Sequence, residues 1–440
     1  MMSHNREGWW QSLFNANTSI GQRVLFFLAV LFTSVLYFGK TIRSDIRAGD
    51  GDGFPGIDSS SRRNTHHSYH HRDGFYREAS KTVLKPTDAS KSHVLVTGGA
   101  GFIGCHTTRY FASKGYEVVI IDNLSRKGTP ENLDWLREGH PVTHYETDIR
   151  DFEAVTDIFK REKGFSDVIH LAAQVAVTTS VANPRDDFDI NALGTFNMLE
   201  AVRNFCPHAP FIYASTNKVY GLLPHIEVVE GARRYEIKGK KGVSESEPLD
   251  FHSPYGCSKG SADQYVVDYA RIYGLKTVSF RQSCIYGERQ FGVEDQGWMA
   301  WFIIAGILGR SVSIYGDGKQ VRDVLYVHDL VKLYEKSMEQ RNVLSGKAYN
   351  VGGGLENSLS LLEFIEILKD QDLQLSFTFG DWRPGDQRVF ISDNTKVEKE
   401  LDWKPETAPD QGIRNLMSWV RENKKMLNFL LGDSNDADRN

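Results

Sequence analysis

The chain has 440 residues, of which 40% are hydrophobic and 25% are charged, so it can bury a large core organised as two or three domains. Its formal net charge of −5 gives no reason to expect a nucleic acid partner. The four cysteines, at positions 105, 206, 257 and 284, have neither paired nor framework spacing, so the sequence indicates neither structural zinc nor a disulfide scaffold.

An apolar run near the N-terminus is the first patterned segment. Residues 24–38 are largely apolar, and extension back to Ile20 brings the run close to the ~20 residues that span a bilayer as a helix. A cleaved signal peptide and a buried helix are the alternatives, but no small-residue cleavage site follows the run. We predict a polar segment over 1–19 and a single-pass membrane anchor over 20–39, in the Golgi or ER system. Basic residues on both sides leave the orientation open.

Residues 40–91 are rich in Gly, Ser, Asp, Arg and His and show almost no apolar periodicity. This composition predicts a disordered, solvated stalk. The pairs His66-His67 and His70-His71 would hold a metal if they were helical, but a polar linker is the better interpretation. We therefore predict no metal site.

A strand, a glycine turn and a helix are predicted at residues 93–104. Gly98 allows a sharp turn, Gly101 allows the backbone to approach a pyrophosphate, and Gly104 allows the helix to pack against the strand. The open amides and the positive end of the helix then suit phosphate groups. A strand-to-helix turn that binds no ligand can have the same pattern, so evidence for a dinucleotide site must come from the residues that follow.

Asp122 follows the next apolar run, at close to the ~20 residues after the turn that dinucleotide sites show. A carboxylate there accepts hydrogen bonds from an adenosine ribose, and it repels a 2′-phosphate. The pattern favours NAD over NADP, although Arg126 and Lys127 leave NADP open. The alternative role of Asp122 is a turn at the end of a strand.

Apolar strands then alternate with helix-length segments, which predicts an α/β Rossmann fold with a doubly wound parallel sheet. Ligands of such sheets bind at the carboxyl ends of the strands. We expect Asp148-Ile149 near the adenine and Leu171 to Gln174 near the nicotinamide. The predicted strands are 94–97, 117–121, 167–172, 211–214 and 276–280, and the predicted helices are 104–114, 151–163, 188–204 and 257–273.

A possible catalytic group appears at Tyr255 and Lys259, which lie four apart and share one helix face. A neighbouring cation lowers a phenol pKa from ~10 by ~1–3 units, so Lys259 alone is barely sufficient to give a phenolate. An oxidised nicotinamide would supply a second positive charge. Thr216, at the end of a strand, can bond a sugar hydroxyl and relay its proton. A surface helix pair and a Ser/Thr turn are the alternatives.

The part after Cys284 predicts a second, smaller lobe that binds substrate, with a ligand cleft between the lobes. Residues 323–338 and 348–352 look like a helix and a strand that return to the first domain. We therefore expect a NAD-binding Rossmann domain over 92–285, a substrate-binding lobe over 286–430 that is partly interleaved with it, and a tail over 431–440.

Residues 93–420 resemble the extended short-chain dehydrogenase/reductase superfamily, the nucleotide-sugar epimerases and dehydratases. The resemblance rests on TGGAGFIG at 97–104, Asp122, Asn191-Ala192-Leu193-Gly194, Thr216, and Tyr255 with Lys259. Longer runs resemble the CDP-paratose 2-epimerases, also called CDP-tyvelose epimerases. These runs are residues 215–221, 250–260, 295–298, 320–325 and 386–390.

The resemblance implies an isomerase that binds NAD and a nucleotide sugar, with a CDP-sugar favoured, and that inverts C2 of CDP-paratose. It also implies that Arg322 and Arg383 grip the diphosphate. Asn217 and Lys218 stand where dehydratases carry an Asp-Glu pair, which favours epimerisation. A 4-epimerase, a UDP-glucuronate decarboxylase and a non-catalytic NAD-binding scaffold remain alternatives, and we expect a homo-oligomer.

The candidate catalytic residues are Thr216, Tyr255 and Lys259, and the candidate substrate-binding residues are Thr216, Arg322 and Arg383. The candidate cofactor-binding residues are Gly98, Gly101, Phe102, Ile103, Gly104, Asp122, Asn123, Asp148, Ile149, Leu171, Ala172, Ala173, Gln174, Asn191, Tyr255 and Lys259.

Overall fold

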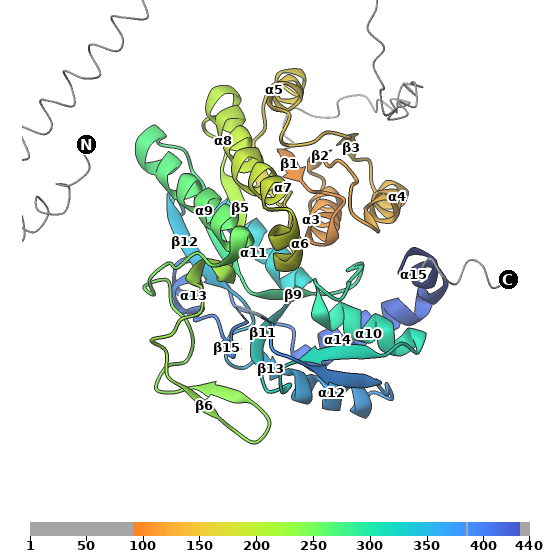
Figure 1. The fold of residues 1–440 in the computed structure, drawn as a ribbon. Coiled ribbons are helices and arrows are strands. Elements are labelled where there is room, and N and C mark those ends of the chain that lie inside the picture. Colours follow the sequence, from red (N-terminus) through yellow and green to blue (C-terminus); the bar gives the residue numbers. More distant parts are fainter. Residues whose placement is uncertain (1–91, 384–385, 432–440) are drawn as a thin grey trace, which may run out of the picture. The chain divides into compact units, whose positions relative to one another are not determined.

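The computed structural model describes residues 92–383 and 386–431 (Figure 1). The predicted polar segment, membrane anchor and stalk, and all of the predicted tail except its first residue, lie outside these residues. Within the described ranges, none of the helices combines the length and the apolar character that crossing a membrane requires.

A seven-stranded parallel sheet forms the centre of the fold, in the order β12-β8-β5-β4-β1-β2-β3. This topology confirms the predicted doubly wound α/β fold. The strands are β1 (His93–Thr97), β2 (Glu117–Ile121), β3 (Thr143–Tyr145), β4 (Asp167–His170), β5 (Phe211–Thr216), β8 (Thr277–Gln282) and β12 (Lys347–Val351).

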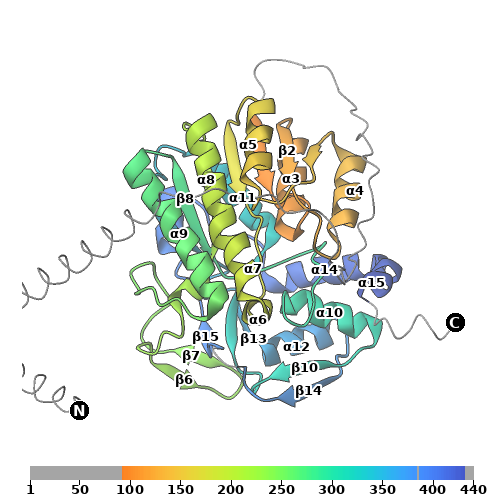
Figure 2. The same cartoon turned by 45° about the horizontal axis from the view of Figure 1, so that its top comes forward.

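Helices cover both faces of this sheet because its strands are apolar on both faces (Figures 1 and 2). Val94 and Val96 of β1 pack toward one face, in a core with α3 and α11, whereas Leu95 packs toward the other face with α5, α8 and α9. The alternation follows the two-residue period of a strand. The helices are α3 (Phe102–Ser113), α4 (Thr129–Gly139), α5 (Phe152–Arg161), α6 (Val177–Ala182), α7 (Pro184–Phe188), α8 (Gly194–Phe205), α9 (Ser253–Tyr273) and α11 (Val327–Glu339).

The predicted helix over 188–204 is interrupted in the structure. Asn183 caps α7 through the amide of Asp186, and a π-helical turn, η1 (Asp189–Leu193), then joins α7 to α8. The turn contains the buried side chain of Asn191. Such insertions in a helix often mark functional sites.

The second lobe is built around β11 (Val321–Tyr326), whose residues 323–326 the sequence analysis placed at the start of a helix. This strand pairs in parallel with β9 (Cys284–Tyr286) and β15 (Val389–Phe390), and antiparallel with β13 (Ser358–Ser360). Its residues Val321, Asp323, Val324, Leu325 and Tyr326 are buried, so a two-sided strand suits them better than an amphipathic helix.

Among the described residues, four helices and two small β-pairs complete this lobe, and one of the pairs comes from residues 228–237, which were predicted to belong to the first domain. Its main core joins α10, α12, α14 and α15. Their bounds are α10 (Trp298–Leu308), α12 (Leu361–Asp370), α14 (Pro409–Glu422) and α15 (Lys424–Leu431). The pairs are β6 (Val228–Glu230) with β7 (Tyr235–Ile237), and β10 (Val312–Tyr315) with β14 (Phe377–Gly380).

After β11 the chain returns to the main sheet. Helix α11 packs against α3, and β12 becomes the edge strand beside β8. Two short elements finish the fold: a 3₁₀ turn, η2 (Asn217–Tyr220), follows β5, and α13 (Thr395–Leu401) packs near β12. The chain therefore leaves the main sheet after β8 and returns to it at β12.

Candidate active site

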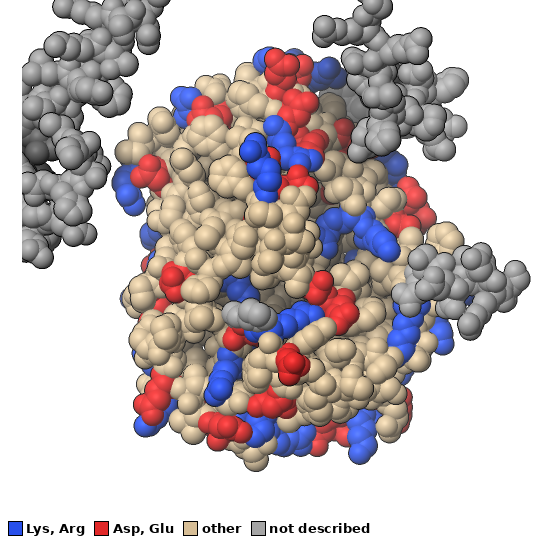
Figure 3. Space-filling view, viewed as in Figure 1, with Lys and Arg blue, Asp and Glu red and all other residues tan. Residues whose placement is uncertain are grey.

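A cavity of about 470 Å³ lies at the carboxyl ends of the main-sheet strands. The glycine turn, the ends of β2, β4 and β5, the start of α9, and most of residues 282–299 line it. Figure 3 shows that this face of the molecule is hollowed and that lysine and arginine side chains lie beside the hollowed areas. Fifteen of the predicted site residues line the cavity. They are Gly98, Gly101, Phe102, Ile103, Gly104, Asp122, Asn123, Asp148, Ile149, Leu171, Ala172, Ala173, Thr216, Tyr255 and Lys259.

The glycine turn is sterically suited to a pyrophosphate. Gly98 has a φ of +66°, and a Cβ atom there would lie 2.7 Å from the Ala172 nitrogen. A Cβ atom on Gly104 would lie 1.9 Å from the Gly98 carbonyl oxygen, so the close contact between helix and strand requires glycine. Among the described residues, no side chain caps the start of α3 at Gly101. Its first amides are thus available to an anion.

Asp122 is held at the end of β2 by backbone amides. Its two carboxylate oxygens accept hydrogen bonds from Ala100 (3.0 Å) and Leu124 (2.9 Å). The side chain lines the cavity and is 8% exposed, and burial raises its pKa. Asp122 can therefore hold the turn and bind a ribose at the same time, because each carboxylate oxygen keeps a second lone pair for a ligand.

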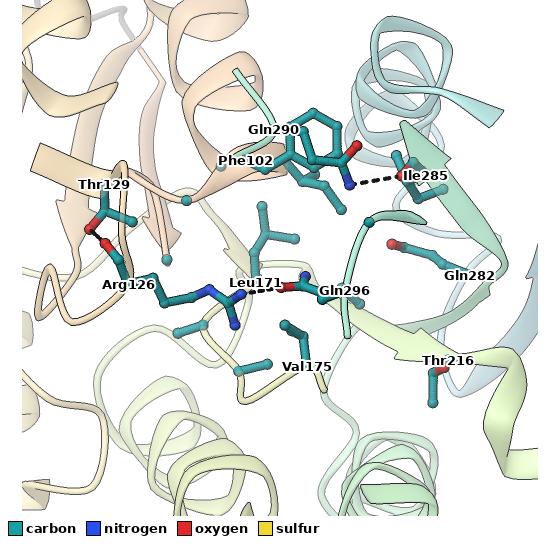
Figure 4. A pocket seen from close by; sticks show the side chains of 18 of the residues that line it. Phe102, Arg126, Thr129, Leu171, Val175, Thr216, Gln282, Ile285, Gln290 and Gln296 are labelled. Atoms are coloured by element: carbon teal, nitrogen blue, oxygen red, sulfur yellow. Dashed lines mark hydrogen bonds between the residues drawn. The ribbon is translucent and has the colours of Figure 1, made fainter. Parts of the chain in front are cut away.

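Arg126 reaches across the cavity, as Figure 4 shows. Its guanidinium donates a hydrogen bond to the side chain of Gln296, and its backbone carbonyl accepts one from Thr129 (2.7 Å). The sequence analysis considered Arg126 only as a possible partner for a 2′-phosphate. The structure instead links it to the segment before α10, and in Figure 4 the bond passes between Leu171 and Val175.

Gln174 and Asn191 do not line the cavity, unlike the other candidate cofactor residues. The Asn191 oxygen accepts a hydrogen bond from the Gln174 amide (2.9 Å), and both side chains donate to the buried carboxylate of Asp187. Asp187 also accepts a bond of 2.5 Å from Ser258 on α9. These residues brace the cavity wall against α9, a role that needs the folded arrangement to be recognised.

Tyr255 and Lys259 occupy the first turns of α9, and Thr216 ends β5. Burial raises the pKa of Tyr255 to about 12, whereas its hydrogen bond to Thr216 and the charge of Arg126 lower it. Lys259 donates a hydrogen bond of 2.6 Å to the Ala214 carbonyl and lies 4.4 Å from the Tyr213 ring centre. The phenol is therefore protonated near neutral pH, and Arg126 is a cation whose charge lowers its pKa.

Lys259 is itself strongly perturbed. Burial lowers its pKa from 10.5 to about 7, although the carboxylates of Asp263 and Asp187 oppose this shift. The ammonium is therefore easily deprotonated near neutral pH. A pKa close to the working pH suits a group that exchanges protons during catalysis.

Arg322 and Arg383 both form ion pairs and do not line the cavity. Arg322 on β11 donates to Asp386 (2.6 Å). Arg383 lies 3.3 Å from an Asp295 oxygen and 3.9 Å from the Tyr315 ring centre. Of their two carboxylate partners, Asp295 lines the cavity and Asp386 does not.

The sequence analysis left several cavity residues out of its candidate site residues, although it named Lys218 for its place in a dehydratase motif. Lys218, Gln282, Ser283, Gln290 and Trp298 all contribute to the wall. Burial and the neighbouring Arg322 lower the pKa of Lys218, which places two cations close together on the substrate side. The run at 295–298 was noted only for its resemblance, although its position before a buried helix marks it as a wall of the site.

The comparisons with known proteins agree with this fold. The sequence model of the family described as GDP-mannose 4,6 dehydratase matches residues 95–416. A CDP-paratose 2-epimerase from Salmonella typhi is 44% identical over 334 residues, covering 74% of this chain and 98% of that protein. The chain belongs to this family of NAD-dependent epimerases and dehydratases.

Solved structures of related epimerases have a similar fold. The UDP-glucose 4-epimerase from Thermotoga maritima, solved with UDP-glucose, has a TM-score of 0.66 and 32% identity over 76% of this chain and 99% of its own. The Thermus thermophilus UDP-glucose 4-epimerase, solved with NAD, has a TM-score of 0.63 and 30% identity over 75% and 99%. Our protein is thus an enzyme of the family, and its cofactor is NAD.

Proposed function

We propose that the protein is a nucleotide-sugar epimerase that inverts C2 of CDP-paratose to give CDP-tyvelose. The observation that carries this proposal is the 44% identity to a CDP-paratose 2-epimerase over nearly all of that protein. The site supports the same reaction type, because Thr216, Tyr255 and Lys259 line one cavity with the glycine turn.

Two further cavity residues favour epimerisation over elimination. Asn217 and Lys218 directly follow Thr216 and line the cavity. A dehydration needs an acid and a base beside the sugar. An amide and a lysine do not provide that carboxyl pair, whereas oxidation and re-reduction at one carbon need neither group.

In the proposed reaction, Tyr255 takes the proton of the C2 hydroxyl, and Thr216 hydrogen-bonds to the same oxygen. Bound NAD supplies the hydride acceptor at C2 and, once reduced, the hydride donor for the return step. Because burial holds the phenol pKa at about 12, Tyr255 needs added positive charge to act as a base. Arg126 and a protonated Lys259 provide charge from this chain.

Inversion requires the 2-keto sugar to present its other face while the nucleotide stays bound. We assign Arg322 and Arg383 to the diphosphate during this turn. Both guanidinium groups already pair with carboxylates, Arg322 with Asp386 and Arg383 with Asp295. A diphosphate carries more charge and more acceptor oxygens, so it can replace these carboxylates.

A product analysis tests the proposal. The full-length protein is incubated with CDP-paratose, UDP-glucose and UDP-glucuronate in D₂O, and products are identified by NMR and mass spectrometry. We expect CDP-tyvelose with a largely unlabelled C2–H, because the hydride returns from the cofactor. Inversion at C4, loss of CO₂, or stoichiometric deuterium at C2 would refute the assignment, and no turnover at all would favour the scaffold alternative.

We also propose that residues 20–39 anchor the enzyme in a Golgi or ER membrane as a single span. The support is the sequence alone: an apolar run of near-spanning length with basic flanks. Alkaline carbonate extraction of membranes tests this. The full-length protein should stay in the pellet, and release into the supernatant would leave a targeting peptide as the better interpretation.

A further inference from the structure

Three potential metal ligands meet outside the proposed active site. His106 lies on α3, Glu288 follows β9, and His328 is in the first turn of α11. One ligand atom from each residue lies within 4.8 Å of the other two. The three residues are far apart in the sequence and have no spacing typical of metal ligands. The sequence analysis therefore expected no metal site.

The hydrogen bonds of His106 fix which of its nitrogens is free to bind. Its Nε2 lies 2.8 Å from the backbone carbonyl oxygen of Glu288, and a carbonyl only accepts, so Nε2 carries the proton. The Nδ1 atom of a neutral ring then has an open lone pair. A histidine ligand in a metal site commonly donates its other N–H to a backbone carbonyl, as His106 does here.

The spacing of the two rings suits a tetrahedral ion. His106 Nδ1 and His328 Nε2 are 3.1 Å apart. Two nitrogens at ~2.0–2.1 Å from a tetrahedral zinc ion are about 3.3 Å apart. An ion can thus take the place of the proton shared by the rings with only a small movement of the side chains.

The carboxylate of Glu288 is already oriented by a neighbour. Tyr326 Oη lies 2.7 and 2.8 Å from its two oxygens, and Asn415 in turn donates to Tyr326 (3.1 Å). Glu288 and His328 have access to solvent, whereas His106 is buried. The cluster therefore has a held carboxylate and an entry path.

We propose that His106 Nδ1, His328 Nε2 and the Glu288 carboxylate bind one divalent transition-metal ion, with zinc best matched to the donors. Two imidazoles and one carboxylate suit zinc, whereas calcium and magnesium prefer oxygen ligands. Water completes the coordination. The ion is structural: it links α3, which starts at the glycine turn, to the segment whose residues Gln290 and Phe291 line the cofactor cavity.

The test measures bound zinc in the full-length protein. The four histidines at 66, 67, 70 and 71 are replaced by asparagine in every sample, so that they do not contribute. Protein stripped with EDTA is loaded with ZnCl₂, dialysed, and analysed by mass spectrometry of the metal and by titration calorimetry. We expect one zinc per chain, and His328→Gln and Glu288→Gln should each weaken zinc binding by at least about tenfold.

Two controls keep the result interpretable. His252→Gln changes an exposed histidine outside the cluster and should leave zinc binding unchanged. Trp135 lies 6.0 Å from His106, so Co²⁺ bound at the site should quench its fluorescence, and Trp135→Phe should remove that quenching. No retained zinc, or zinc that neither cluster variant weakens, would reduce the cluster to a hydrogen-bonded histidine pair and overturn the proposal.

Discussion

Lys259 donates a hydrogen bond of 2.6 Å to the carbonyl oxygen of Ala214, which ties the first turns of α9 to the end of β5. Ala214 precedes Thr216 by two residues on β5, so the bond holds the ammonium close to the proposed catalytic residues. It also holds the ammonium in a buried place, where its pKa falls to about 7. The folded protein therefore holds Lys259 in this position although burying its charged form costs free energy.

That cost predicts a pH-dependent stability difference for Lys259→Met. The folded-state pKa is about 7 and the ordinary value is 10.5, so the cost is fully present below pH 7 and disappears as the pH rises toward 10.5. From pH 7 to pH 9, the wild-type protein should gain about 2 kcal/mol of unfolding free energy relative to the variant. Denaturant unfolding at both pH values measures this, with the exposed Lys241→Met as control.

Tyr255→Phe should lower kcat by about 10²–10⁴-fold while NAD affinity stays near that of the wild type, because the lost hydroxyl transfers a proton and contributes little to binding. Steady-state kinetics and cofactor titration measure the two effects. Tyr265→Phe, on the exposed side of the same helix, is the matched control. Near-normal turnover in Tyr255→Phe would remove the proposed mechanism.

Arg322→Gln should raise the KM for the nucleotide sugar by about 10–100-fold, since a charge-assisted bond contributes ~1.5–3 kcal/mol. The NAD affinity should not change. Arg310→Gln is the control, because that side chain bonds to Leu431 and Asn428 in the second lobe. A variant whose kcat falls at constant KM would show that Arg322 does not bind the diphosphate in the ground state.

Lys218→Met should reduce kcat/KM for the sugar, since this ammonium lines the cavity beside Thr216. Lys218→Arg should recover part of the loss because it keeps the charge. Binding of the free nucleotide, followed by calorimetry, separates contact with the nucleotide from contact with the sugar. Equal activity of the methionine variant and the wild type would exclude Lys218 from substrate binding.

The expected homo-oligomer has a candidate surface on α8 and α9, which lie side by side in Figures 1 and 2. Phe196 is 36% exposed, Tyr265 46%, Ile272 62% and Tyr273 51%, which makes an unusual apolar face for two packed helices. The double change Tyr265→Lys with Ile272→Lys should yield a monomer in analytical ultracentrifugation. Val343→Lys, at an exposed apolar position outside both helices, should leave the assembly intact.

Local sequence patterns were enough to predict most of the fold and the cofactor-binding part of the site. The glycine turn and Asp122 were predictable because each residue answers a nearby backbone requirement: the φ of +66° at Gly98, and the amides of Ala100 and Leu124 beside Asp122. The sequence spacing of Tyr255 and Lys259 likewise follows from one helical turn.

Contacts between distant segments were not predictable in this way. The bond from Arg126 to Gln296 joins residues 170 positions apart, and neither residue has a distinctive local pattern. The same holds for Asp187, which joins Gln174 to Ser258. The raised pKa of the Tyr255 phenol was also not predicted, because its largest cause is burial, which depends on the whole surrounding fold.

The position of β12 at the edge of the main sheet has a consequence for biosynthesis. Its partner β8 ends at Gln282, but β12 itself begins only at Lys347. On the ribosome, the exposed edge of β8 must therefore wait until residues 283–346 are translated and β12 can follow them. We expect a nascent chain stopped before Lys347 to be recognised by chaperones and proteases, so the two lobes reach the native state together.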